Sequence, residues 1–100
     1  MERMGSSLRL VGFALLLAAA GCSSLPVQEM SDARQAIYSA RAVGGDHYTP
    51  ESLHEAERLV AQAVERLADG DYQSARAAAR DAKRQAISAR EAALAVSSAH

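Results

Sequence analysis

The chain has 100 residues, a formal net charge of −1 and an apolar fraction of 49%. This length allows at most one domain, and the near-neutral charge excludes the broad basic surface of a nucleic-acid-binding protein. Tryptophan is absent and Phe13 is the only phenylalanine, so large side chains for a core are scarce. We therefore expect no enzyme, no cofactor and no small-molecule substrate.

The first 21 residues have the pattern of a secretory signal. Arg3 and Arg9 make the start of the chain weakly positive, and residues 10–20 are all apolar or small. A helix needs roughly 20 apolar residues to cross a bilayer core, and this run is shorter. The pattern predicts a signal peptide over residues 1–21 that is removed by cleavage.

The only cysteine follows this segment directly, in the motif Ala19-Ala20-Gly21-Cys22. The motif resembles the lipobox of bacterial lipoproteins, with alanine at position 19 where that family most often has leucine. The resemblance implies cleavage between Gly21 and Cys22, lipid on the Cys22 thiol, and the membrane as a partner through acylated Cys22. Two or more acyl chains hold a protein stably at a bilayer, whereas a single chain holds it marginally.

Ser23 follows the cysteine, where inner-membrane lipoproteins of Gram-negative bacteria commonly have aspartate. The resemblance thus implies a lipid anchor on the periplasmic face of the outer membrane, if the source is Gram-negative. The alternative is an ordinary secreted protein with a free Cys22, but a lone thiol in an oxidising compartment is prone to intermolecular pairing. Nucleic acid is not an expected partner in the periplasm.

The rest of the chain is interpreted as a tether and a helical domain. Apolar residues recur at spacings of three and four, which indicates amphipathic helices, and no segment has the pattern of a strand. The predicted fold is all-α: an antiparallel helical hairpin with a third, N-terminal helix. The predicted segments are the lipidated N terminus and tether at 22–28, the alanine-rich domain at 29–100, and helices at about 30–43, 50–69 and 72–97.

Glycine, proline and capping residues mark the ends of these helices. Gly44-Gly45 is expected to end the first helix, with residues 46–48 completing the connection. Thr49 is expected to cap the second helix with its hydroxyl, ahead of Pro50 in the first helical position. The second helix should end near Asp69-Gly70, and the next residue, an aspartate, can cap the third.

Alanine recurs along the third predicted helix at alternating spacings of four and three. Small side chains let two helix axes approach closely, so this stripe predicts a packing seam, either within the chain or between copies. Residues 51–71 carry six acidic and two basic side chains, and residues 72–100 carry five basic and two acidic ones, which favours pairing of the two helices. The candidate seam residues are Ala75, Ala79, Ala82, Ala86, Ala89 and Ala93.

A turn and a set of spaced apolar residues form a pattern between positions 49 and 94. The pattern consists of Pro50, Leu53-x-x-Ala56, Leu59, Ala63, and Gly70-Asp71-Tyr72-x-x-Ala75 followed by spaced alanines. It resembles a short domain of unknown function found in bacterial lipoproteins, sometimes ahead of an OmpA-like peptidoglycan-binding domain. The turn is also similar to that of tetratricopeptide helical hairpins. The resemblance implies a shape and an envelope location, and no activity.

Candidate sites for chemistry are weak. His47 and His54 lack the spacing that sets two metal ligands on one helical face, so no metal site is predicted. The basic residues at 76, 80, 83 and 84 are interpreted as a solvated face that complements the acidic second helix. The three tyrosines are interpreted as packing groups at helix ends.

The preferred functional hypothesis is a non-catalytic helical interaction module, anchored to the membrane, whose partner is another envelope protein or a second copy. The alternative is a structural envelope lipoprotein that spaces or contacts the cell wall as a homo-oligomer.

Overall fold

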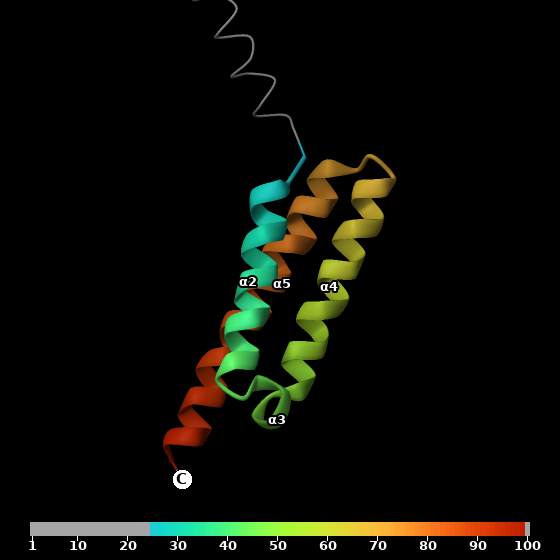
Figure 1. The fold of residues 1–100 in the computed structure, drawn as a ribbon. Helices are drawn as coiled ribbons and strands as arrows, with labels where there is room; N and C mark the ends of the chain where they lie inside the picture. The colour runs from blue at the N-terminus through green and yellow to red at the C-terminus, as the bar shows by residue number, and fades with distance from the viewer. Residues whose placement is uncertain (1–24, 100) are drawn as a thin grey trace, which may run out of the picture.

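The structure is a computed structural model that describes residues 25–99, and these residues form helices joined by short turns, with no strand among them. The all-α prediction is therefore confirmed. The predicted signal peptide and Cys22 lie outside the described residues. The helices are α2 at Val27–Ala42, α3 at Gly45–Tyr48, α4 at Pro50–Ala68 and α5 at Tyr72–Ser98 (Figure 1).

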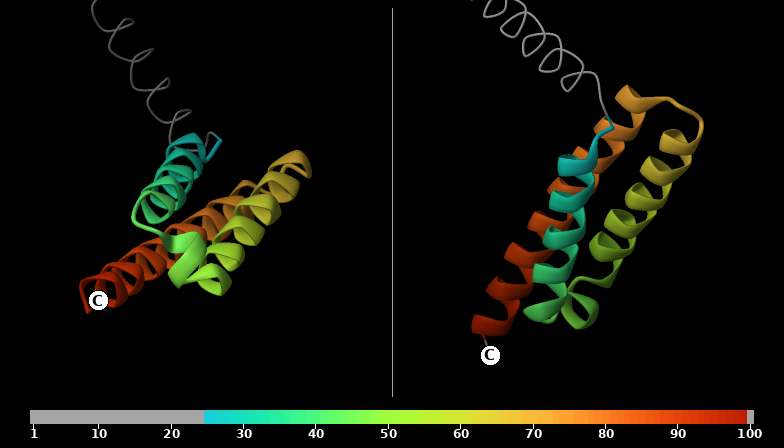
Figure 2. Two further views of the ribbon diagram at one scale, coloured as in Figure 1. Left: turned by 60° about the horizontal axis from the view of Figure 1, so that its bottom comes forward. Right: turned by 45° about the horizontal axis from the view of Figure 1, so that its top comes forward.

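The longest helix, α5, is the element on which the others pack. α4 runs antiparallel along it and forms the predicted hairpin, while α2 lies beside α5 and runs in the same direction (Figures 1 and 2). α2 and α4 each contact α5 extensively and contact one another much less. The two helices therefore rest on α5 side by side rather than closing tightly on each other.

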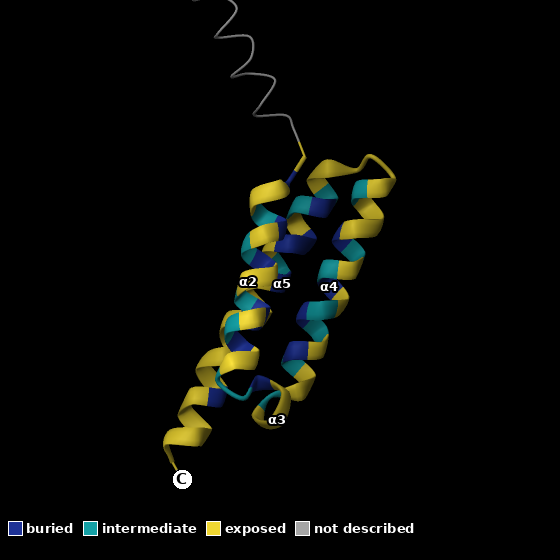
Figure 3. Cartoon of the chain, in the orientation of Figure 1, coloured by how far each residue is buried: buried dark blue, intermediate teal, exposed yellow. Residues whose placement is uncertain are grey.

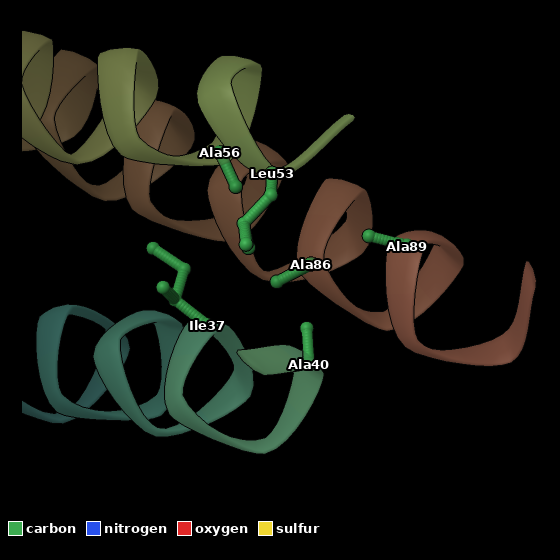
Figure 4. Packing of buried hydrophobic residues seen from close by; sticks show 6 residues of the cluster. All are labelled: Ile37, Ala40, Leu53, Ala56, Ala86 and Ala89. Atoms are coloured by element: carbon green, nitrogen blue, oxygen red, sulfur yellow. The ribbon is translucent and has the colours of Figure 1, made fainter. Parts of the chain in front are cut away.

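The core consists of three layers stacked along the bundle, and each layer takes residues from α2, α4 and α5. Val60 on α4 packs against all three. The layer nearest the α4–α5 turn contains Met30, Ala63, Ala78 and Ala79. The middle layer contains Ala33, Leu59 and Ala82. The layer nearest α3 contains Ile37, Ala40, Leu53, Ala56, Ala86 and Ala89 (Figure 4).

The buried residues of α5 are all alanine. Because an alanine side chain ends at Cβ, the backbones of α2 and α4 can come close to α5, and the larger side chains of α2 and α4 fill the layers. All six alanines of the predicted seam are 0% exposed. The buried stripe lies on the inner side of α5 (Figure 3). The chain itself covers this seam.

The turn between α4 and α5 forms as the sequence predicts. Gly70 has a φ of 78°, its N–H donates to the carbonyl of Leu67 at 3.0 Å, and the Asp71 N–H donates to the carbonyl of Arg66 at 2.9 Å. This pair of bonds is the Schellman motif, which favours glycine because of its positive φ. The Asp71 carboxylate then accepts from the Ser74 N–H at 3.2 Å, which confirms the predicted cap of α5.

The corner between α2 and α4 differs from the prediction. Gly45, expected to end the first helix, and residues 46–48, expected to complete the connection, form the short helix α3. Gly44 ends α2 in the left-handed conformation, with a φ of 91°, while Gly45 is needed for close packing. A Cβ on Gly45 would lie 2.7 Å from the carbonyl oxygen of Ala40. Four residues are too few to show a helical period, so the sequence gives no signal for α3.

Two further expectations need correction. Val27 and Gln28, predicted to belong to the tether, are the first residues of α2.

Thr49 stands at the N-cap of α4, but its side chain makes no capping hydrogen bond. Its ψ of 53° lies outside the extended region in which an N-cap hydroxyl usually reaches the first-turn N–H groups. The hydroxyl instead lies within donating distance of the carbonyls of Gly45, at 3.2 Å, and Ala89, at 3.1 Å. Thr49 thus ties the corner to α5.

Candidate functional site

An open groove runs between α2 and α4. Its larger part has a volume of about 520 Å³ and is lined mainly by apolar side chains, among them Val27 and Met30 from α2 and Val64 and Leu67 from α4. A second hollow of about 290 Å³ shares Arg34 and Tyr38 with the first, so the groove continues toward α3. The residues that line both parts come from α2, α4 and the segment just before α2. The groove exists because α2 and α4 both pack on the alanines of α5 and stay apart from each other.

Large apolar side chains are exposed along this groove. Tyr38 is 78% exposed, Val27 is 66% exposed, and Val64 and Leu25 are each close to half exposed. Tyr38 was interpreted as a packing group at a helix end, but it lies inside α2 on the rim of the groove. The cause is its place on the helix: the buried stripe of α2 runs through Met30, Ala33, Ile37 and Ala40, and position 38 falls on its flank.

Charged side chains flank the half of the groove that lies nearest α3. Arg41 on α2 reaches across to pair with Glu57 on α4, and its Nε lies 3.7 Å from an Asp46 carboxylate oxygen in α3. Arg34 stands two helical turns from Arg41 on the same rim. Within residues 25–99, Arg34 has no ion-pair partner. An apolar groove with one unpaired guanidinium at its edge therefore faces solvent.

The basic side of α5 pairs with α2 and not, as predicted, with the acidic α4. Arg76 Nε lies 3.1 Å from the Glu29 carboxylate, and the Arg80 guanidinium lies 3.8 Å from it. Lys83 Nζ lies 3.8 Å from Asp32. These three cations follow one another at helical spacing on the side of α5 that faces α2, so their partners come from α2.

A separate ion pair lies on the outer surface of α4. The hydrogen bond from Arg58 holds the pKa of the Glu55 carboxyl below its usual range, and the same bond raises the pKa of Arg58. The two groups are 2.7 Å apart and exposed, so their pairing is a surface contact that contributes little to folding.

A sequence profile described as a domain of unknown function, DUF4398, matches residues 28–99. The chain belongs to the DUF4398 family. This agrees with the predicted resemblance to a domain of unknown function over residues 49–94, and it adds α2 to the domain. No curated protein and no solved structure matches the chain.

The DUF4398 domain thus contains the whole of α3, α4 and α5 and nearly all of α2, so both walls of the groove belong to it. Over the part of the chain that the structure covers, no helix is long and apolar enough to cross a membrane. In the same part, no three His, Cys, Asp or Glu side chains lie together in a way that could hold a metal ion. The predicted cleavage and lipidation residues, Gly21 and Cys22, lie outside it.

The groove is the feature that sequence reasoning missed. The spacing of apolar residues predicted amphipathic helices, and the alanine stripe predicted the buried face of α5. The signal for the groove was the combination of large apolar residues on two helices with only alanine on the buried face of the third. As a result, the faces of α2 and α4 that carry large side chains both contact α5 but lie apart from each other.

Proposed function

We propose that this DUF4398 chain is a non-catalytic helical interaction module held at the bacterial envelope membrane by a lipid on Cys22. The observation that carries the interaction role is the apolar groove between α2 and α4, where Tyr38, Val27 and Val64 are exposed together. Exposing a contiguous apolar patch to water is unfavourable, and such a patch commonly marks an interaction site.

The shape of the groove favours a helix as its occupant. Two nearly parallel walls, α2 and α4, form a long open trough, and an amphipathic helix can lay its apolar face into such a trough. The walls are held at a fixed separation because each is packed on the alanine seam of α5. The unpaired guanidinium of Arg34 at the rim would favour an occupant with an acidic residue on its flank.

The lipid anchor would set this groove close to the membrane. Leu25, which lines the end of the groove, comes three residues after Cys22. Three residues of extended chain span about 10 Å, so an acylated Cys22 would keep the groove beside the bilayer surface. Partners reached by such a groove would be envelope proteins or neighbouring copies of this chain.

Replacing Cys22 with serine tests the anchor. Because the hydroxyl of serine does not take the thioether-linked lipid, we expect Cys22→Ser protein to move from the membrane pellet to the soluble fraction, with loss of metabolic fatty-acid labelling. Cell fractionation of the full chain in a Gram-negative host measures this. Ser24→Ala is the matched control and should stay in the pellet. An unchanged membrane fraction for Cys22→Ser would contradict the proposed lipid anchor.

A photoreactive amino acid placed at position 38 tests the groove. We expect crosslinked products in cells, because Tyr38 lies 78% exposed on the groove rim. The same photoreactive residue at position 84, whose side chain is 71% exposed on α5, is the control and should give few or none. Gel shifts of the full chain measure the products. Equal crosslinking from both positions would show that the groove is not a preferred contact surface.

A further inference from the structure

We infer that the groove between α2 and α4 receives the same groove of a second copy, in a twofold dimer that sets α2 against α4 of the other chain. This inference rests on the proposed interaction role of the groove and names its occupant. The alanine seam is already covered within the chain, so it is not available for self-association. Four of the exposed large apolar side chains line the groove, so the groove offers an apolar face to a second copy: Leu25, Val27, Tyr38 and Val64.

The core layers fix the heights of the residues on the two rims. Ala33 and Leu59 share the middle layer, so Arg34 on α2 and Glu57 on α4 stand at nearly the same height on opposite sides of the groove. Met30 and Ala63 share the layer nearest the α4–α5 turn, so the apolar end of α2 stands level with Val64. The groove thus has a charged level and an apolar level, each with contributions from both helices.

A twofold axis parallel to the helices uses this arrangement. Such an axis keeps every residue at its own height and exchanges the two sides of the groove. Arg34 of one copy then faces Glu57 of the other, and Val27 faces Val64 at the apolar level. Because α2 and α4 run in opposite directions, the four helices at the interface pack antiparallel across it, with each α5 on the outside.

The alternative twofold axis, perpendicular to the helices, fits less well. It would set α2 against α2, so that rims carrying Arg34 and Arg41 oppose each other with like charge. It would also place the two N termini at opposite ends of the dimer. With the parallel axis, both N termini leave from the same end, and two acylated Cys22 residues can enter one bilayer.

Charge complementarity favours a second copy over an unrelated helix. Arg34 has no acidic partner in residues 25–99, whereas Arg41, two helical turns further along the same rim, already pairs with Glu57. In the dimer, Arg34 and Arg41 both lie near a Glu57 carboxylate, one from each chain. The Arg34–Glu57 contact thereby occurs twice in the dimer, once on each side of the axis.

A charge-exchange experiment tests this dimer. Two differently tagged full-length chains are produced together, solubilised in a mild detergent, and assayed by co-purification and by light scattering for mass. We expect wild-type chains to co-purify as a dimer. Arg34→Glu in both chains, or Glu57→Arg in both, sets like charges together at two places and should lower co-purification at least about tenfold.

Mixing the two variants gives the decisive result. An Arg34→Glu chain paired with a Glu57→Arg chain again has opposite charges at both contacts, so co-purification should return toward the wild-type level. Arg84→Glu, on the exposed outer side of α5, is the matched control and should leave the dimer unchanged. Far-ultraviolet circular dichroism of each variant verifies that the helices are intact, since Glu57→Arg also removes the exposed pair with Arg41.

The outcomes separate this inference from the proposed function. Rescue by the mixed pair supports the twofold dimer. A monomeric wild-type chain, or single variants that neither weaken the dimer nor rescue each other, overturns it. Crosslinks from position 38 to a different protein, with a monomeric chain in the membrane fraction, overturn the dimer and leave the interaction role in place. A wild-type chain that is absent from the membrane fraction, together with no crosslinks from position 38, would instead overturn the proposed function.

Discussion

Replacing Ala82 with glutamate is expected to unfold the bundle, with or without a partner. Ala82 is 0% exposed and lies in the middle layer between Ala33 of α2 and Leu59 of α4. Overpacking a core costs about 1–3 kcal/mol, and burying an unpaired carboxylate costs several kcal/mol more. A domain of this size rarely obtains more than about 3–5 kcal/mol of stability from its core. Urea unfolding of the detergent-solubilised full chain, followed by circular dichroism, measures the loss.

Ala77→Glu is the matched control for this change, because position 77 is exposed on the same helix. We expect it to alter the free energy of unfolding by no more than about 0.5 kcal/mol. If Ala82→Glu kept the helical signal and the urea midpoint of the wild type, the alanine stripe of α5 would not lie between α2 and α4, and the arrangement of the helices would be wrong.

Leu53→Ala is expected to have the second largest effect. Leu53 is 1% exposed and belongs to the layer nearest α3, where alanines of α2, α4 and α5 surround it (Figure 4). Removing a buried leucine side chain costs about 2–5 kcal/mol, because the lost apolar contact adds to the cavity that remains. In a domain of 60–100 residues this corresponds to a fall in Tm of roughly 10 °C or more.

Leu25→Ala provides the comparison for Leu53→Ala, since Leu25 is 46% exposed at the end of the groove. The same atoms are removed, but about half of the Leu25 surface is already exposed, so less burial is lost and we expect a smaller fall in Tm than for Leu53→Ala. Thermal unfolding of both variants by circular dichroism distinguishes them. Similar melting temperatures for the two variants would contradict the layered core.

Local signals in the sequence were sufficient to predict the three long helices and the α4–α5 turn. Glycine at a positive φ and an aspartate cap act within a few residues of their position, so Gly70 and Asp71 could be interpreted without the tertiary fold. The period of alanine along α5 likewise marks its buried face, because helical geometry fixes which positions share a side. These features depend only on neighbours in the chain.

Features that depend on the placement of whole helices could not be predicted. Both α2 and α4 carry acidic residues and pack on α5, and only the side on which each helix lies decides that Arg76 and Lys83 pair with α2. The hydroxyl of Thr49 binds the carbonyl of Ala89, 40 residues away, instead of capping its own helix. Tyr38 lies on the flank of the buried stripe of α2, and only the placement of α4 leaves this flank uncovered.

The parallel course of α2 and α5 has a mechanical consequence for a chain anchored through its N terminus. A pull on that end along the bundle would slide α2 lengthwise against α5, so all three core layers would be sheared at the same time. A sideways pull would instead peel α2 away one layer after another and meet less resistance at each step. The fold is therefore expected to resist tension along its long axis better than tension across it.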